Sequence, residues 1–135
     1  MHLLTLTGLR DFANHRPGML SGGMRQRAAF CRALLADPEL LLLDEPFGAL
    51  DALTREELSL ELSRLWGELG RTALLITHDI EEAILLGDRV IIMSPRPGRI
   101  RADIPVDLPR PRTVATAAHP RFQEIKQMEI GRAHV

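Results

Sequence analysis

The chain has 135 residues, of which 45% are hydrophobic, and its formal net charge is −1. This length allows one modest domain, and the apolar fraction is sufficient for a hydrophobic core. The near-zero net charge argues against a general nucleic-acid binder or a protein that binds anionic membranes, and no apolar run is long enough to span a bilayer. The single cysteine, Cys31, excludes an internal disulfide bond and a cysteine-based zinc site, and it fits a reducing compartment.

The first third of the chain is predicted to contain a capped helix. Residues 1–9 indicate the end of a short apolar helix, after which a loop leads to Ser21, a typical N-cap residue. Asp37–Pro38 would end the helix that Ser21 begins. Cys31 lies in an apolar part of this helix, so we expect it to be buried and unreactive.

Two glycines, Gly22 and Gly23, follow Ser21 in the first turn of the predicted helix. Glycine lowers helix stability there, but it allows a ligand to approach the backbone N–H groups at the positive end of the helix dipole. The pattern therefore has two interpretations. Either it forms an anion-binding helix N-terminus to which Ser21 adds a hydroxyl donor, or it is a flexible loop before an ordinary capped helix.

The stretch Leu40–Asp51 reads LLLLDEPFGALD. Four consecutive leucines predict a strand that is buried on both faces, as in a parallel sheet, and Pro46 and Gly48 would end it. Asp44 and Glu45 therefore lie at the carboxyl end of the strand, where open α/β sheets bind ligands. Adjacent carboxylates favour a cationic ligand such as a magnesium–nucleotide complex, with one carboxylate at the metal and the other accepting a proton from water. The alternative is a core strand that ends in a charged turn.

A second strand is predicted to end in a polar pair. After an amphipathic helix over Asp51–Leu69, the apolar run Thr72–Thr77 indicates a strand, and His78–Asp79 follow at once. Because parallel strands end at the same edge of a sheet, we expect His78 to approach Glu45 and to contact a phosphate or hold a water molecule. A structural histidine is the alternative.

The remaining elements are predicted to complete an α/β fold. A helix over Ile80–Leu86 precedes a β-hairpin formed by Arg89–Ser94 and Arg99–Val106, and a terminal helix covers His119–Ile130. We expect the proline-rich stretch Asp107–Arg112 to be an extended linker whose arginines are solvated. The order of elements predicts a mainly parallel sheet with flanking helices and an edge hairpin.

Four motifs together resemble those of ATP-binding cassette (ABC) transporter ATPases. They are LSGGMRQR over Leu20–Arg27, similar to the signature motif; LLLLDEP over Leu40–Pro46, similar to the Walker B strand; GALD over Gly48–Asp51, similar to the D-loop; and LLITHD over Leu74–Asp79, similar to the H-loop. The resemblance covers residues 3–129 and implies a partial P-loop NTPase-like domain. MSPRPGRI and similar phrases are most like importer ATPases of the nitrate, sulfonate and taurine type.

The sequence also departs from the family pattern. The family's Walker A loop, aromatic loop and Q-loop precede the signature motif, and these 135 residues contain no GxxxxGK[ST] sequence. We therefore predict a C-terminal part of such an ATPase, inactive alone: the end of the helical subdomain in residues 1–36, half of the RecA-like core in 37–106, and a linker and helix in 107–129. Residues 130–135 resemble the translation of a sequencing adapter, and we predict that they are a non-native tail.

The resemblance implies catalytic roles at the strand ends. Asp44 would bind Mg²⁺, Glu45 would be the general base for the attacking water, and His78 would contact the γ-phosphate of ATP.

The resemblance also implies residues that act across a head-to-tail dimer of two ATPase subunits, which encloses two ATP molecules. Ser21, Gly22 and Gly23, together with Gln26, would bind the nucleotide held by the partner subunit. Asp51 would couple the two sites.

The function implied is that of an ATP-hydrolysing subunit on the cytoplasmic face of the bacterial inner membrane. Its partners would be a second ATPase subunit, a transmembrane permease and, indirectly, a periplasmic or extracellular solute-binding protein, with no nucleic acid. One alternative is a short non-hydrolytic module that supplies the signature motif in trans to a complete ATPase. Another is a structural interaction domain, against which the joint presence of Ser21, Asp44, Glu45 and His78 argues. In each case we expect exposed apolar faces.

Overall fold

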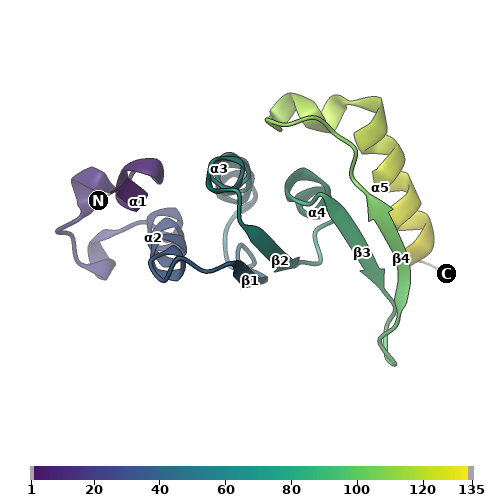
Figure 1. Ribbon diagram of the computed structural model, residues 1–135, viewed down its shortest axis with the longest axis horizontal. Coiled ribbons are helices and arrows are strands. Elements are labelled where there is room, and N and C mark those ends of the chain that lie inside the picture. Colours follow the sequence, from purple (N-terminus) through teal and green to yellow (C-terminus); the bar gives the residue numbers. More distant parts are fainter. Residues whose placement is uncertain (1, 134–135) are drawn as a thin grey trace. The chain divides into compact units, whose positions relative to one another are not determined.

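The computed structural model describes residues 2–133, which divide into two units at the boundary between Ile76 and Thr77 (Figure 1). The first unit contains α1 (His2–Leu6), α2 (Gly22–Leu34), β1 (Leu40–Asp44), α3 (Ala52–Leu69) and β2 (Thr72–Ile76). The second unit contains α4 (Ile80–Leu86), β3 (Arg89–Met93), β4 (Ile100–Pro105) and α5 (Pro120–Ala133). Short 3₁₀ helices cover Arg10–Phe12, Pro17–Met19 and Val114–Ala118. None of the described helices has both the length and the apolar character needed to cross a membrane.

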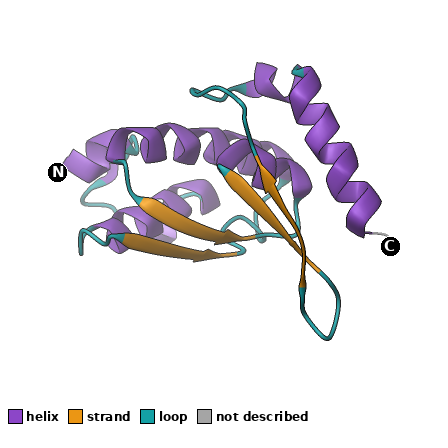
Figure 2. Ribbon diagram, turned by 45° about the vertical axis from the view of Figure 1, so that its right-hand side comes forward, coloured by secondary structure: helices purple, strands orange, loops and turns teal. Residues whose placement is uncertain are grey.

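The strands form two separate pairs, which are drawn in orange in Figure 2. In the first unit β1 and β2 are parallel, with Leu40 opposite Thr72 and Asp44 opposite Ile76. In the second unit β3 and β4 are antiparallel, and an irregularity in their register lies between Ile92 and Met93. The α/β class, the parallel pairing and the hairpin predicted from the sequence are therefore confirmed.

The core of the first unit lies on one face of β1. Leu41 is 6% exposed and packs with Leu34 of α2 and Leu65 of α3. Leu40 and Leu42, whose side chains point to the other face, are 52% and 66% exposed. The prediction that this strand is buried on both faces is wrong, because α2 and α3 pack against the Leu41 face and leave the alternate leucines exposed. The expectation of exposed apolar surface is confirmed.

Cys31 belongs to the contact between α1 and α2. Its side chain is buried, and Sγ lies 3.2 Å from the Thr7 hydroxyl oxygen and 3.6 Å from the carbonyl oxygen of Leu3. The predicted burial of this cysteine is confirmed.

The second unit has its own core between the hairpin and two helices. Ile104 of β4, Ile84 of α4, and Phe122 and Ile125 of α5 are buried together. Phe122 and Ile125 thus form the buried face of the terminal helix, whose presence the sequence predicted. Helix α5 continues to Ala133, whereas residues 134–135 lie outside the described residues. The prediction that residues 130–135 are non-native stays a prediction.

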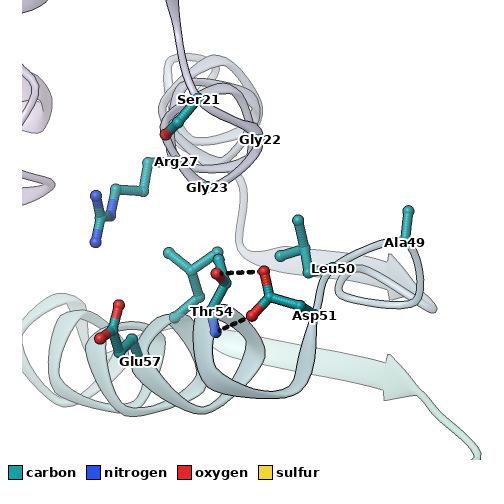
Figure 3. A pocket seen from close by; sticks show the side chains of 10 residues that line it. Ser21, Gly22, Gly23, Arg27, Ala49, Leu50, Asp51, Thr54 and Glu57 are labelled. Atoms are coloured by element: carbon teal, nitrogen blue, oxygen red, sulfur yellow. Dashed lines mark hydrogen bonds between the residues drawn. The ribbon is translucent and has the colours of Figure 1, made fainter.

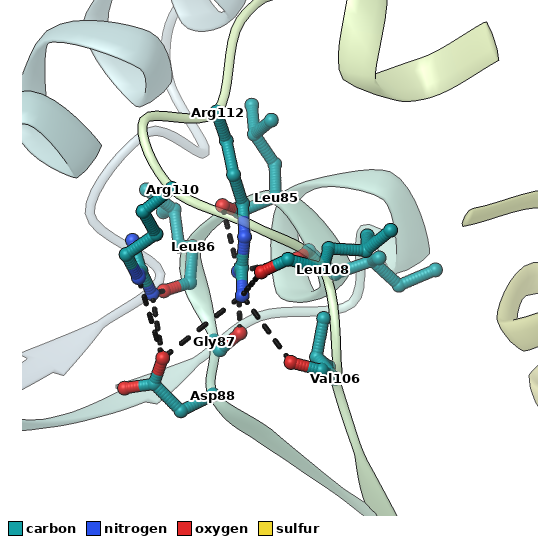
Figure 4. A network of polar contacts seen from close by, with 9 residues as sticks. Leu85, Leu86, Gly87, Asp88, Val106, Leu108, Arg110 and Arg112 are labelled. Carbon is teal, nitrogen blue, oxygen red and sulfur yellow. Dashed lines mark hydrogen bonds and ion pairs between the residues drawn. The ribbon is translucent and has the colours of Figure 1, made fainter. Parts of the chain in front are cut away.

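One arginine of the segment after β4 is buried rather than solvated. Arg112 is only 4% exposed, and its guanidinium Nη1 donates hydrogen bonds of 3.0 and 3.2 Å to the carbonyl oxygens of Ile84 and Leu85 (Figure 4). Nη2 donates longer bonds of 3.4 Å to the carbonyl oxygens of Val106 and Leu108. The predicted solvation of this arginine is wrong, because its side chain spans the gap between α4 and the end of β4.

Two arginines of this segment donate hydrogen bonds to backbone carbonyl groups at the C-terminal end of α4. The carbonyl groups of the last helical turn lack partners within a helix and are stabilised by cations. Arg112 contacts the Ile84 and Leu85 carbonyl oxygens, and Arg110 donates to that of Leu86 at 2.8 Å. Burial, with repulsion from Arg110, lowers the pKa of Arg112 to about 10, while Asp88 opposes the shift. Arg112 therefore stays protonated at neutral pH.

We expect the variant Arg112→Met to lower the free energy of unfolding by about 3 kcal/mol, because it leaves several buried carbonyl groups without a donor. Urea denaturation of this chain measures the change. Arg99→Met, at an exposed position next to the hairpin turn, is the matched control and should change the free energy of unfolding by less than about 0.5 kcal/mol. Equal denaturation midpoints for the two variants would contradict the structural role of Arg112.

Glu129 is a buried acid on α5. The residue is 5% exposed, and its Oε1 atom has no hydrogen-bond partner among the described residues. Burial raises the pKa of Glu129 from 4.5 to about 7, since the charged form is poorly solvated. Between these two pH values the folded state retains a proton that the unfolded state releases. The free energy of unfolding should therefore fall as pH rises through this range and remain low above it.

We expect Glu129→Gln to remove this pH dependence, because the amide does not titrate. The wild-type chain should lose on the order of 3 kcal/mol of stability between about pH 4.5 and pH 7 through this group, and the variant should lose none of it. Denaturant unfolding at both ends of the range measures the difference. Glu124→Gln, at an exposed position of the same helix, should keep the wild-type slope. A steep slope that persists in Glu129→Gln would show that another group is responsible.

Candidate functional site

The carboxyl end of the parallel strand pair presents two adjacent acids. Asp44 is the last residue of β1 and lies opposite Ile76, the last residue of β2. The next backbone N–H, that of Glu45, donates to the Ile76 carbonyl oxygen at 2.8 Å and so extends the ladder by one bond. Both acidic residues are exposed. The edge of the sheet therefore places two carboxylates where a solvent-borne ligand can reach them.

Glu45 has an unusual backbone. Its φ is +46°, in the left-handed region that residues other than glycine adopt at a cost of about 1–3 kcal/mol. Its carbonyl oxygen accepts a 3.2 Å hydrogen bond from the N–H of Gly48. A side chain at Gly48 would begin 3.5 Å from the Glu45 carbonyl oxygen and 3.9 Å from its Oε2 atom, in ordinary van der Waals contact with Glu45. Sequence reasoning missed this conformation, because nothing in the residue type of Glu45 indicates it.

The N-termini of α2 and α3 are both capped by side chains. Ser21 Oγ accepts a 3.1 Å bond from the Met24 N–H, as the sequence predicted. The carboxylate of Asp51 accepts bonds of 2.9 Å from the Thr54 N–H and from the Thr54 hydroxyl. These bonds favour the charged form and lower the pKa of Asp51.

A cavity of about 420 Å³ lies between these two helix N-termini (Figure 3). Its lining combines Ser21, Gly22 and Gly23 of the first cap with Asp51 and Thr54 of the second. The fold thus joins two motifs that are about 30 residues apart in the chain. Their backbone and hydroxyl groups form a polar recess that can take a small polar or charged group.

Two polar residues of α2 contact other parts of the unit. The Gln26 amide nitrogen Nε2 donates to the carbonyl oxygen of Pro46, and Arg27 Nε lies 2.6 Å from Oε2 of Glu61 on α3. The role of Gln26 in nucleotide binding, expected from the sequence, stays a prediction.

His78 lies in the second unit, two residues beyond the end of β2, and its side chain is exposed. Next to it, the Asp79 N–H donates to Thr77 Oγ1 at 3.0 Å, and Asp79 caps α4 by accepting a 3.0 Å bond from the Glu82 N–H. The proximity of His78 to Glu45 stays a prediction. Among residues 2–133, no group of three or more His, Cys, Asp or Glu side chains forms a metal-binding cluster.

Comparisons with known proteins agree with the motifs. The sequence model of the family described as ABC transporter matches residues 1–48. A protein of Brucella abortus (strain 2308) that is named for ATP binding is 54% identical over 125 residues, or 93% of this chain and 48% of that protein. The taurine import ATP-binding protein TauB of Jannaschia sp. (strain CCS1) is 46% identical over 134 residues, or 96% of this chain and 50% of that protein. This chain belongs to the ABC transporter family of ATP-binding proteins.

Solved structures support the same fold. The chain of cbiO1 from Clostridium perfringens, part of the ABC transporter complex cbiONQ, superposes with a TM-score of 0.71 and 26% identity, covering 96% of this chain and 45% of that one. The ATP-binding cassette MJ0796, in a dimeric post-hydrolysis state bound to ADP and Pi, gives a TM-score of 0.59 at 37% identity, covering 79% and 45%. This chain spans about half the length of the curated relatives it matches.

The ABC signature glycines have unequal surroundings. Gly23 is buried, and a Cβ there would lie 3.2 Å from Thr54 Cγ2 and 3.8 Å from Leu58 Cδ1 of α3. Gly22 is exposed, and the nearest side-chain atom to its Cβ position would be 3.6 Å away, on Leu50. Gly23 therefore permits close packing of the signature helix on α3, a reason that sequence analysis did not consider. Gly22 remains open to a ligand.

We expect Gly23→Ala to give a free energy of unfolding about 1 kcal/mol lower than Gly22→Ala. Alanine usually favours a helix over glycine by about this amount, but crowding against Thr54 should offset that gain at Gly23 alone. Chemical denaturation of both variants provides the measurement. Adding Thr54→Ser, which removes the crowding methyl and keeps the hydroxyl, should restore the stability of Gly23→Ala. Equal stability of the two alanine variants would reject the packing role.

Proposed function

We propose that this chain supplies the signature motif and the acidic catalytic edge of an ATP-hydrolysing subunit of an ABC importer. The observation that carries the proposal is the exposed pair Asp44–Glu45 at the carboxyl end of β1, with Glu45 in a left-handed turn. Strained backbone at the end of a parallel strand is typical of functional sites. Membership of the ABC family supports ATP as the ligand.

Asp44 fits a magnesium ion that accompanies ATP. Mg²⁺ in such sites is held by one or two carboxylates and takes its other ligands from water and phosphate oxygens. An exposed carboxylate at a strand end meets this requirement, and when bound the ion neutralises charge on the phosphate oxygens.

Glu45 would act as the general base. A carboxylate one residue beyond Asp44 can accept the proton of a water molecule that attacks the γ-phosphate. His78 would donate a hydrogen bond to the same phosphate and orient the water.

The N-terminus of α2 would bind the ATP held by a second subunit. Ser21 offers its hydroxyl, and Gly22 is an exposed residue at the positive end of a helix of 13 residues. Asp51, which shares the cavity with Ser21, would couple the two sites of a head-to-tail dimer. The dimeric state of MJ0796 bound to ADP and Pi supports this arrangement.

The transported solute would be a small solute such as nitrate, a sulfonate or taurine. Several relatives named as taurine import proteins support this substrate class. Partners would be a transmembrane permease and a solute-binding protein, with the ATPase at the cytoplasmic face of the inner membrane.

A chimera tests the catalytic assignment. Residues 3–129 would replace the matching half of the Jannaschia sp. relative, and ATP turnover and retained ATP would be measured. We expect Glu45→Gln to lower kcat by about 10² to 10⁴ fold and to leave ATP bound, because only the base is lost. Glu68→Gln, at an exposed position of α3, is the control and should keep full turnover.

Turnover in Glu45→Gln equal to that of the unchanged chimera would reject Glu45 as the base. The 135-residue chain alone serves as a baseline. It contains no GxxxxGK[ST] sequence, so we expect it to bind ATP weakly and to hydrolyse it negligibly.

A further inference from the structure

Helix α2 contacts the turn that follows the catalytic edge at two points. Gln26 and Phe30 lie one helical turn apart, on the same side of α2. The Gln26 amide donates to the Pro46 carbonyl oxygen, and the Phe30 and Phe47 rings meet edge to face with centroids 5.8 Å apart and planes at 69°. Both phenylalanines are buried. Gln26 and Phe30 of α2 therefore contact Pro46 and Phe47, which are consecutive residues of the turn.

The contact of α2 with Pro46 and Phe47 lies next to Glu45, the residue with the strained backbone. Pro46 directly follows Glu45, whose φ is +46°, and the Glu45 carbonyl closes the turn onto the Gly48 N–H at 3.2 Å. A left-handed residue other than glycine persists only where its surroundings fix it. On one side Glu45 is fixed by its N–H bond to Ile76, and on the other side the contacts of Gln26 and Phe30 fix the chain.

We propose that Gln26 is a positioning residue for Glu45. By holding the Pro46 carbonyl, it keeps the turn in the conformation that directs the Glu45 carboxylate toward its ligand. The proposal rests on the proposed function of Glu45 as the base. It also gives Gln26 a role different from nucleotide binding, because its amide donor is directed at the Pro46 carbonyl of its own unit.

Amide hydrogen exchange in this chain tests the contact without any need for ATPase activity. Gln26→Glu keeps the size of the side chain and replaces the donor by an acceptor that faces a carbonyl oxygen. We expect the Gly48 and Leu50 amides, which bond to Glu45 and Phe47, to exchange about tenfold faster. Gln26→Lys keeps a donor and should stay within about twofold of the wild type.

Gln123→Glu is the matched control. It removes the same kind of bond, from Nε2 to the Ala117 carbonyl oxygen at 2.7 Å, at the start of α5. It should leave exchange at Gly48 and Leu50 unchanged. Unchanged exchange at these two amides in Gln26→Glu would overturn the proposal, whatever the activity of the chimera.

Steady-state kinetics of the chimera separate positioning from ligand binding. We expect Gln26→Glu to lower kcat about tenfold with KM for ATP within about twofold, and Gln26→Lys to restore kcat. A raised KM with unchanged kcat would overturn the proposal in favour of a nucleotide ligand. Equal kcat in Gln26→Glu and Gln123→Glu would overturn it as well. The Glu45→Gln variant tests separately whether Glu45 is the base. Hydrogen exchange tests the Gln26 contact and does not depend on the role of Glu45.

Discussion

The site depends on the parallel pairing of β1 with β2. This pairing ends in the hydrogen bond from the Glu45 N–H to the Ile76 carbonyl oxygen. It places Asp44 and Glu45 at one edge of the strand pair, and it sets the point from which the chain continues to His78. Immediately after this bond the backbone of Glu45 turns left-handed. The acidic edge is therefore defined by backbone geometry, which is the kind of preorganisation that the proposed phosphoryl transfer would use.

The signature motif serves packing in addition to the ligand-binding role that we propose for it. Gly23 lets α2 approach Thr54 of α3, whereas Ser21 and Gly22 line the cavity beside Asp51. A motif with both duties tolerates few substitutions, since a larger residue affects either the spacing of the helices or access to the backbone. The same helix reaches the turn after β1, so the two motif regions of the first unit form one packed structure.

Sequence analysis could predict what depends on local patterns. The cap formed by Ser21, the parallel strands and the burial of Cys31 follow from residue type and periodicity. It could not predict what depends on distant contacts. Arg112 was expected to be solvated because nothing near it in sequence shows the α4 carbonyl groups that it contacts. The left-handed Glu45 and the crowding at Gly23 likewise depend on β2 and α3.

The most direct measurement is a crystal structure of the chimera as a dimer with Mg²⁺ and a non-hydrolysable ATP analogue. We expect Asp44 beside the metal, with Glu45 and His78 of one subunit facing the γ-phosphate and Ser21 of the other subunit contacting it. A structure in which the His78 imidazole lies on the opposite side of the sheet from Glu45 would contradict the assignment of this edge as the catalytic centre.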